Sequence, residues 1–419
     1  MELVNGKYHI QGVNVLDIAK EFGTPVYVYD ANKLISQLER LKKAFSGVKL
    51  RIKFACKSLT NISVMKLLRQ HGAEVDAVSI QEVKIAMMAG FTPEEILYTP
   101  NCVSFSEIKE AVELGVMINI DNISILEQFG HEYRDTVPCC IRINPHITAG
   151  GNYKIQVGHI ESKFGISIFQ MPHIKRVVKT NNIRVVGLHM HSGSDILESE
   201  VFLRAAKVLF DATEGFEHLQ FIDLGSGFKV AYREGDITTD IEELGEKMTA
   251  SFKEFCQQYG KELELWFEPG KFIVSEAGFL LVRANVIKHT PSAVFVGVDS
   301  GMNHLIRPMM YDAYHSMVNV TNTEGPTRIY TVVGYICETD TFGWDRKMDE
   351  IIEGDIIAIK NAGAYGYTMS SNYNSRPRPS EVLVINGQAK LVRKRETLED
   401  IVKNQIDIFE EELANKTYK

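Results

Sequence analysis

Residues that could do chemistry recur directly after, or at the end of, short apolar runs of this sequence. Lys57 follows RIKFAC (51–56), His191 follows IRVVGLHM (183–190), and Glu268 lies within LELWFEPG (263–270). A lysine that faces an enclosed pocket can be held partly neutral and can attack a carbonyl group as an amine nucleophile. A carboxylate on a neighbouring strand can keep a pyridine nitrogen protonated, and an imidazole offers a flat surface for stacking. Together these groups favour covalent chemistry on an aromatic carbonyl compound.

Glycine turns follow the last two of the apolar runs, at Gly225-Ser226-Gly227 and at Gly270. Such turns expose backbone N–H groups, which are the usual phosphate cradle at strand ends. An amine for a Schiff base, a phosphate cradle and an acid for a pyridine nitrogen are the three requirements of pyridoxal 5′-phosphate. Each group alone is common in ordinary structure, as a salt-bridged lysine, a turn or a helix-start carboxylate. Their coincidence at one set of strand ends predicts a site for this cofactor.

Eight apolar runs alternate with amphipathic helical stretches between residues 30 and 276, which is the pattern of a TIM (β/α)8 barrel. The predicted strands are 51–56, 74–79, 96–100, 116–121, 138–144, 183–190, 219–225 and 263–270. The rival fold, a doubly wound open sheet, usually has fewer strands and a GxGxxG turn after the first, and neither feature is present. Because barrel enzymes place their chemistry at the carboxyl ends of the strands, the candidate residues are expected to share one rim.

Both ends of the chain have β character. Asn5-Gly6 and Asn386-Gly387 each join two short β-type runs and are strong hairpin signals. After residue 277 the helical period gives way to β-type runs, and only 396–416 returns to a helical pattern. We therefore predict an all-β domain, barrel-like or sandwich-like, built from residues 1–29 and 277–419 with the N-terminal hairpin joining it.

Composition excludes several classes of protein. The formal net charge is −8, from 46 Lys and Arg against 54 Asp and Glu, without basic blocks for nucleic acid or anionic membrane. No apolar run approaches the ~18 residues of a membrane span. The first residues lack the apolar core of a signal peptide, so a cytoplasmic location is expected. The six cysteines form no CxxC pair and no metal-ligand spacing, which predicts mostly buried thiols and no metal site.

Nine ordered motifs identify a family resemblance over essentially the whole chain. They are FACKSLTN (54–61), DAVSIQE (76–82), KFGI (163–166), GLHMHSGSDI (187–196), DLGSGF (223–228), EPGKFIV (268–274), DSGMNHLIRPMMYDAYH (299–315), CETD (337–340) and GAYGYTMSSNYNSRPRP (363–379). With these motifs the chain resembles the pyridoxal-phosphate-dependent decarboxylases of the alanine-racemase fold type, which act on ornithine, diaminopimelate or arginine. Such proteins pair a TIM barrel with a β-domain.

The resemblance implies a role for each matching position. Lys57 would bind the cofactor as a Schiff base with Asp76 beside it, His191 would stack on the ring, and Glu268 would pair with the pyridine nitrogen. The phosphate would be held by Ser194, Gly227, Gly270 and Tyr365. The substrate would be bound by Lys271, Arg307, Tyr311, Glu338 and Tyr365. Cys337 and Glu338 would come from the partner subunit of a head-to-tail homodimer, with Cys337 as proton donor.

A substrate follows from these roles. Arg307 suits a distal carboxylate and Glu338 a distal amine, which together fit meso-2,6-diaminopimelate and its decarboxylation to L-lysine, the last step of lysine synthesis. The alternatives keep the fold: a decarboxylase of carboxynorspermidine, ornithine or arginine, a racemase, or an inactive regulator. Lys271 stands where the family usually has arginine, Ser226 interrupts a glycine triplet, and Thr339 follows Glu338. These departures affect specificity, since no reacting group is missing.

Overall fold

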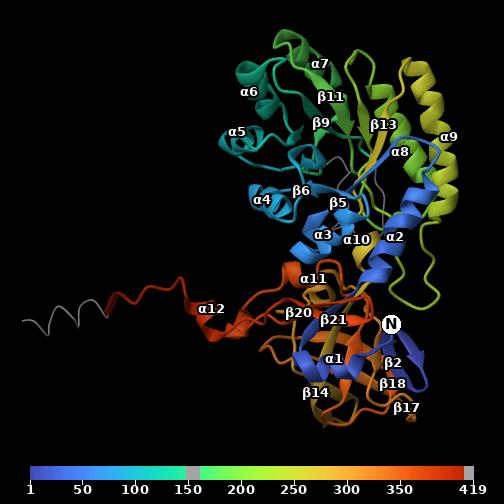
Figure 1. Ribbon diagram of the computed structural model, residues 1–419, viewed down its shortest axis with the longest axis vertical. Coiled ribbons are helices and arrows are strands. Elements are labelled where there is room, and N and C mark those ends of the chain that lie inside the picture. Colours follow the sequence, from blue (N-terminus) through green and yellow to red (C-terminus); the bar gives the residue numbers. More distant parts are fainter. Residues whose placement is uncertain (148–160, 410–419) are drawn as a thin grey trace, which may run out of the picture.

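The computed structural model describes residues 1–147 and 161–409, which form an α/β barrel stacked on a β-rich domain. Figure 1 shows the barrel with its ring of helices above and the β-domain below, with the N-terminus beside the latter. Every helix within these residues is too short or too polar to span a lipid bilayer.

The barrel has the eight parallel strands that the sequence predicts. They are β5 (Leu50–Ala55), β6 (Glu74–Ala77), β7 (Ile96–Tyr98), β8 (Met117–Ile120), β9 (Cys139–Asn144), β11 (Val185–His189), β12 (Phe221–Asp223) and β13 (Glu264–Phe267). Each pairs in parallel with the next, β13 pairs with β5, and β8 with β9, so the sheet closes. A two-residue strand, β10 (Ile166–Ser167), adds to β9.

Helices cover the outside of the barrel. They are α3 (Ile62–Gln70), α4 (Ile80–Met88), α5 (Phe105–Glu113), α6 (Ile123–Tyr133), α7 (Met171–Thr180), α8 (Ser199–Ala212) and α9 (Ile241–Tyr259). The eighth unit differs from the regular pattern, because α10 (Lys271–Val274) is a single turn. Helix α2 (Ala31–Ala44), which precedes the first barrel strand and begins at the capping residue Asp30, packs between α3 and α9 instead.

The β-domain is built around a second sheet that draws strands from both ends of the chain. Its main path is β18 (Thr341–Asp349), β17 (Thr327–Val333), β15 (Val294–Val298), β14 (Gly278–His289), β4 (Val26–Asp30), β20 (Ser380–Ile385) and β21 (Gln388–Arg393). Two further strands, β16 (Met317–Asn319) and β19 (Ile356–Ile359), pair with each other, and β19 pairs with β14. Three short helices complete the described domain: α1 (Val15–Phe22), α11 (Arg307–Tyr311) and α12 (Leu398–Val402).

Both Asn-Gly hairpins are confirmed. Asn5 and Gly6 have positive φ between β1 (Glu2–Val4) and β2 (Lys7–Ile10), and Asn386 and Gly387 do the same between β20 and β21. With β3 (Val13–Asn14), the first hairpin forms a separate three-stranded sheet. It joins the β-domain by packing: Ile10 and Val15 share an apolar core with Val26 and Phe279. The helical pattern predicted over 396–416 is confirmed only at α12 (Leu398–Val402); residues 403–407 are not helical, so the prediction is wrong there, and residues 410–416 lie outside the described part.

The chain crosses between the domains twice, at adjacent points. It leaves the β-domain after β4 and returns before β14, and these strands pair antiparallel, with Tyr29 opposite Gly278. The backbone N–H of Asp30 donates to the carbonyl of Ala277 at 2.8 Å. A continuous apolar core runs from the barrel into the β-domain. The two domains are therefore joined by packing and by paired strands, which fixes the barrel mouth against the β-domain.

Candidate active site

A cavity of about 500 Å³ opens at the carboxyl ends of the barrel strands, where it faces the β-domain. Eight residues predicted to bind cofactor or substrate line it: Lys57, His191, Ser194, Gly227, Glu268, Gly270, Lys271 and Tyr365. Seven come from loops of the barrel. Tyr365 comes from the β-domain, and its backbone N–H donates to the carbonyl of Ser58 at 2.8 Å, which ties this loop to the one that carries Lys57.

Lys57 lies on the turn that follows β5, with 38% of its side chain exposed to the cavity. Its Nζ donates to Oδ2 of Asp76, a fully buried carboxylate on β6, at 2.8 Å. Burial alone lowers the pKa of Lys57, but the charges of Asp76 and Glu268 and the phenol of Tyr365 outweigh it, so the pKa is raised. The expectation of a partly neutral lysine is therefore wrong for the chain by itself, because the neighbouring carboxylates stabilise the ammonium.

His191 is held in a fixed orientation by the glycine turn after β12. The backbone N–H of Ser226 donates to His191 Nδ1 at 3.2 Å. Gly225 has φ +61°, and a Cβ there would lie 2.7 Å from that same nitrogen, so the turn requires glycine. Burial, with the charges of Arg142 and Lys57, lowers the pKa of His191 to about 3. The ring is therefore neutral near pH 7.

Glu268 belongs to a buried polar cluster at the base of the cavity. Its Oε2 lies 3.1 Å from Nε2 of His189, and its Oε1 has no hydrogen-bond partner within residues 1–147 and 161–409. Asp223 lies beside them. A carboxylate oxygen of Asp223, a carboxylate oxygen of Glu268 and a ring nitrogen of His189 all lie within 4.8 Å of one another. Burial favours the neutral form of Glu268, but the neighbouring His189 and Lys57 outweigh burial and lower the pKa of Glu268. For Asp223, burial and the charge of Glu268 act together and raise the pKa. Glu268 thus presents an ionised oxygen to the cavity.

A second cavity of about 280 Å³ adjoins the first and shares Ser194, Lys271 and Tyr365 with it. It contains Arg307 and Tyr311, both on α11. Lys271 Nζ is 2.5 Å from Oδ1 of Asp195, so its charge is already balanced. The barrel and the β-domain each supply one side of this cavity, as α10 and the loop after β12 face α11.

Cys337 and Glu338 lie apart from both cavities. Each is exposed, on the segment between β17 and β18. The amide of Asn374 donates to Sγ of Cys337 at 3.2 Å, and the hydroxyl of Tyr373 donates to Glu338 at 2.8 Å. The structure therefore does not bring these two predicted residues to the site of their own chain. All six cysteines are free thiols, and the expectation of mostly buried thiols fails at exposed Cys102 as well as Cys337.

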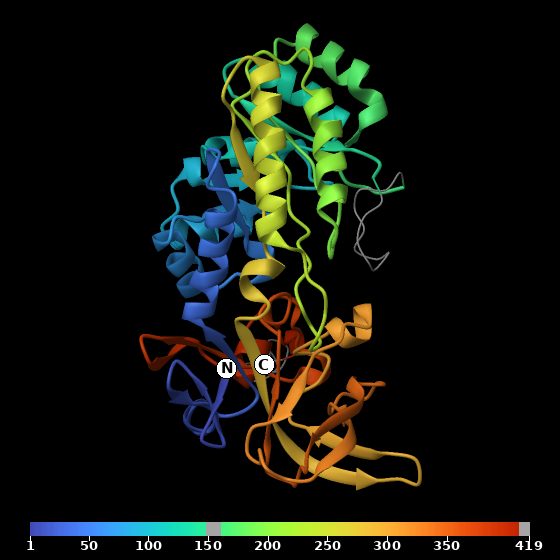
Figure 2. The ribbon, with the colours of Figure 1, turned by 90° about the vertical axis from the view of Figure 1, so that its right-hand side faces the viewer.

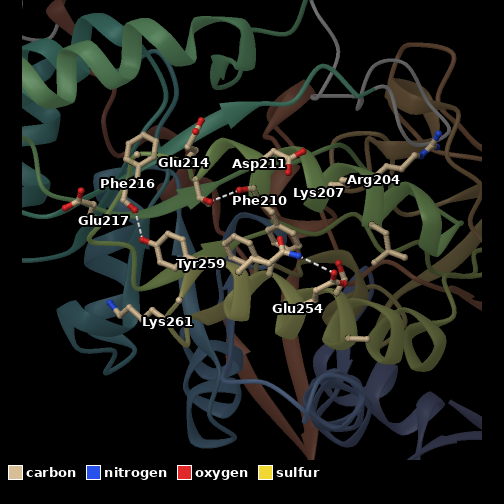
Figure 3. A pocket seen from close by; sticks show the side chains of 18 of the residues that line it. Arg204, Lys207, Phe210, Asp211, Glu214, Phe216, Glu217, Glu254, Tyr259 and Lys261 are labelled. Atoms are coloured by element: carbon tan, nitrogen blue, oxygen red, sulfur yellow. Dashed lines mark hydrogen bonds between the residues drawn. The ribbon is translucent and has the colours of Figure 1, made fainter.

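A larger cavity lies elsewhere, a groove of about 1240 Å³ between α8 and α9 on the outside of the barrel. Figure 3 shows its aromatic floor, with Phe210 and Tyr259, between charged residues that include Lys207 and Glu254. The hydroxyl of Tyr259 donates to the carbonyl of Phe216 at 2.5 Å. None of the residues singled out from the sequence lines this groove. Its lining carries both acidic and basic side chains, so its charge favours neither an anionic nor a cationic ligand.

The residues at the barrel mouth fit pyridoxal 5′-phosphate. Among the described residues, one oxygen of Glu268 has no partner and can accept a hydrogen bond from a protonated ring nitrogen, and Lys57 supplies an amine to the same cavity, which is of suitable size. At Gly227, with φ +121°, a Cβ would lie 2.5 Å from the carbonyl oxygen of Gly193. Only glycine fits between these loops, which lets the backbone of the turn line the cavity closely enough to hold a phosphate.

Several residues of the site were not identified from the sequence, and three of them contact or lie beside a predicted residue. Asp223 ends β12 inside a motif, but its burial beside Glu268 depends on barrel geometry. Asp195 follows Ser194 and has φ +61°, and only the structure shows that it balances Lys271. Tyr232 lies in the loop after β12 and contacts Arg307. In the sequence, each of the three is only a polar residue in or near a motif. Such a position does not indicate which side chain the residue contacts in the fold.

This barrel, with a lysine, an acid and a glycine cradle around one cavity, defines a pyridoxal-phosphate enzyme of the two-domain barrel class. Residues 31–275 match the family model described as pyridoxal-dependent decarboxylase, pyridoxal binding domain. The chain belongs to this family of pyridoxal-dependent decarboxylases. It is therefore a decarboxylase, and pyridoxal 5′-phosphate is its cofactor.

Named relatives match over nearly the full chain. The diaminopimelate decarboxylase of Methanothermobacter thermautotrophicus is 40% identical over 415 residues, which cover 96% of each chain. That of Escherichia coli strain K12 is 33% identical and covers 93% of this chain and 95% of its own. The structure of the Methanocaldococcus jannaschii diaminopimelate decarboxylase with L-lysine superposes with a TM-score of 0.90, at 30% identity and 98% coverage of each chain.

Proposed function

We propose that this enzyme decarboxylates meso-2,6-diaminopimelate to L-lysine and CO₂, the last step of lysine biosynthesis. The observation that carries the substrate assignment is the second cavity, in which the buried guanidinium of Arg307 adjoins the Lys57 cavity. A carboxylate is the natural partner of such a group. The names of the full-length relatives support the same substrate.

The side chains at the barrel mouth divide the work of binding the cofactor. When bound, pyridoxal phosphate supplies an electron sink for the electrons released as CO₂ leaves. Lys57 is its covalent anchor, with Asp76 holding that amine in place. His191 stacks on the ring, and Glu268 keeps the ring nitrogen protonated. The phosphate is held by Ser194, Gly227, Gly270 and Tyr365.

The substrate is held by groups of both domains. Arg307 and Tyr311 bind its distal carboxylate, with Lys271 and Tyr365 close by. Glu338 binds the distal amine, and Cys337 gives a proton to the carbon that has lost CO₂. The exposure of Cys337 and Glu338 supports their entry into the site of a second chain, in a head-to-tail homodimer with shared active sites. We assign residues 30–276 to the cofactor-binding domain and 1–29 with 277–419 to the β-domain, and place the enzyme in the cytoplasm.

The test is CO₂ release from the cofactor-loaded enzyme, offered meso-diaminopimelate, ornithine, arginine and carboxynorspermidine in parallel. Release from diaminopimelate alone, with L-lysine as the product, is the expected result. Enzyme reduced with borohydride, which fixes the cofactor on its lysine, is the blank. Release from one of the other three would keep the fold, the cofactor and Lys57 and would refute the assigned substrate.

A further inference from the structure

Arg307 is a buried cation whose charge has no counterpart among the described residues. It is 8% exposed, its Nε has no hydrogen-bond partner, and its Nη2 donates to the hydroxyl of Tyr232 at 3.2 Å. By contrast, Lys53, a fully buried cation inside the barrel, is paired with Glu74 at 2.6 Å. Because buried charges are normally paired, we expect the anion that pairs with the Arg307 guanidinium to belong to a ligand.

Tyr232 is held from both domains. It lies in the segment between β12 and α9, which Figure 2 shows in yellow-green, descending from the barrel to the β-domain. Its backbone N–H donates to Asp236 at 3.0 Å, and its hydroxyl lies 3.2 Å from Oγ of the buried Ser275. From the β-domain, His315 packs edge-on against its ring, with centroids 5.4 Å apart, and the Arg307 guanidinium lies 5.4 Å from the ring centroid. These contacts fix the direction of the hydroxyl.

The partners of Arg307 on this side are all neutral. Serine and tyrosine hydroxyls carry no charge, and burial, with the Arg307 charge, lowers the pKa of His315 to about 3. An acidic side chain in place of Tyr232 would hold the guanidinium equally well but would neutralise it. A phenol orients the guanidinium and leaves its full charge for the ligand.

We infer that Tyr232 is a positioning residue that determines specificity: it aims Arg307 at the distal carboxylate of the amino-acid ligand without neutralising it. The inference rests on the proposed function, in which Arg307 binds the carboxylate that remains in the product. L-Lysine carries this carboxylate, whereas cadaverine has the same chain and amines without it. The two compounds therefore separate a carboxylate-specific effect from a general one.

The experiment measures the affinity of the cofactor-loaded enzyme for L-lysine and for cadaverine by calorimetry. Tyr232→Phe keeps the ring and its packing against His315 but removes the hydroxyl. We expect L-lysine to bind about tenfold more weakly, the scale of a lost hydrogen bond to a charged group. Cadaverine affinity stays unchanged. Tyr259→Phe, which removes a hydrogen-bonded hydroxyl in the outer groove between α8 and α9, is the matched control and alters neither affinity.

A double-mutant cycle tests whether Tyr232 acts through Arg307. In the Arg307→Met background, Tyr232→Phe is expected to cost no further L-lysine affinity. The same affinity loss for both compounds in Tyr232→Phe, or an additive loss in the double mutant, overturns the inference and leaves the proposed function standing. If the unaltered enzyme has no preference for L-lysine over cadaverine, the proposed function and the inference fall together.

Discussion

Lys57 and Lys271 are the two lysines that line the cavity at the barrel mouth, and they have different surroundings. Lys271 is bound to Asp195 at 2.5 Å and 10% of its side chain is exposed, whereas Lys57 has 38% of its side chain exposed to the cavity. Of these two lysines, Lys57 is the one with a reachable amine. A covalent anchor for the cofactor is therefore expected at this position alone.

Replacing Lys57 by alanine is expected to reduce turnover by about 10³-fold or more, the scale of loss when a nucleophile is removed. The absorbance band that borohydride removes in the unaltered enzyme is absent from this variant. Lys84→Ala, at an exposed lysine of α4 paired with Glu110, is the control and retains both properties. Normal turnover by Lys57→Ala would show that another amine carries the cofactor.

Residue types at strand ends could be predicted because the barrel gathers the carboxyl ends of its strands at one rim. Lys57, His191 and Glu268 were located by that rule. Tyr232 and Asp195 could not be, because their partners, Arg307 and Lys271, lie far away in sequence. The pKa of Lys57 was likewise not predictable, since it depends on carboxylates of two other strands.

At the level of elements, the glycine turn between β12 and α9 supplies a sharp test of the phosphate cradle. Gly227→Ala places a Cβ 2.5 Å from the carbonyl oxygen of Gly193, so one of the two loops must move. We expect the affinity for pyridoxal phosphate to fall by about tenfold or more, which corresponds to about 1.4 kcal/mol. The measurement is equilibrium dialysis of the cofactor against apo-protein, with the melting temperature as a check on folding.

Gly235→Ala separates this clash from backbone strain. Gly235 lies in the same loop with φ +80°, but a Cβ there meets no atom within 4 Å. Gly235→Ala is therefore expected to lower the stability of the fold by about 1 kcal/mol, because alanine disfavours positive φ, without touching the phosphate cradle. Equal loss of cofactor affinity in the two variants would contradict the assignment of Gly227 to the phosphate site.

Elements with a clear period were predicted, whereas those defined by their neighbours were not. The eight barrel strands and both Asn-Gly hairpins follow from local patterns. Helix α11 has five residues beginning with Arg307-Pro308, which is too short for a helical period, although it carries the guanidinium of the second cavity. The substitution of α2 for the eighth barrel helix is a packing outcome that local sequence cannot specify.

For the whole molecule, the proposed site requires two chains. Cys337 and Glu338 are exposed and line neither cavity at the barrel mouth of their own chain. If Cys337 is the proton donor, as we propose, it has to reach the site of another copy. In a closed two-fold dimer each chain then gives these residues to its partner, and both sites are complete.

Mixing Lys57→Ala chains with Cys337→Ala chains tests this arrangement, because each variant alone lacks a group that the reaction needs. In a mixed dimer, one site combines Lys57 of one chain with Cys337 of the other and is intact, while the second site lacks both. Random exchange at equal amounts therefore restores about a quarter of the activity of the unaltered dimer. Differently tagged chains establish that exchange has occurred. Exchange without recovery of activity would mean that each chain completes its own site, and Cys337 would then lose its proposed role as proton donor.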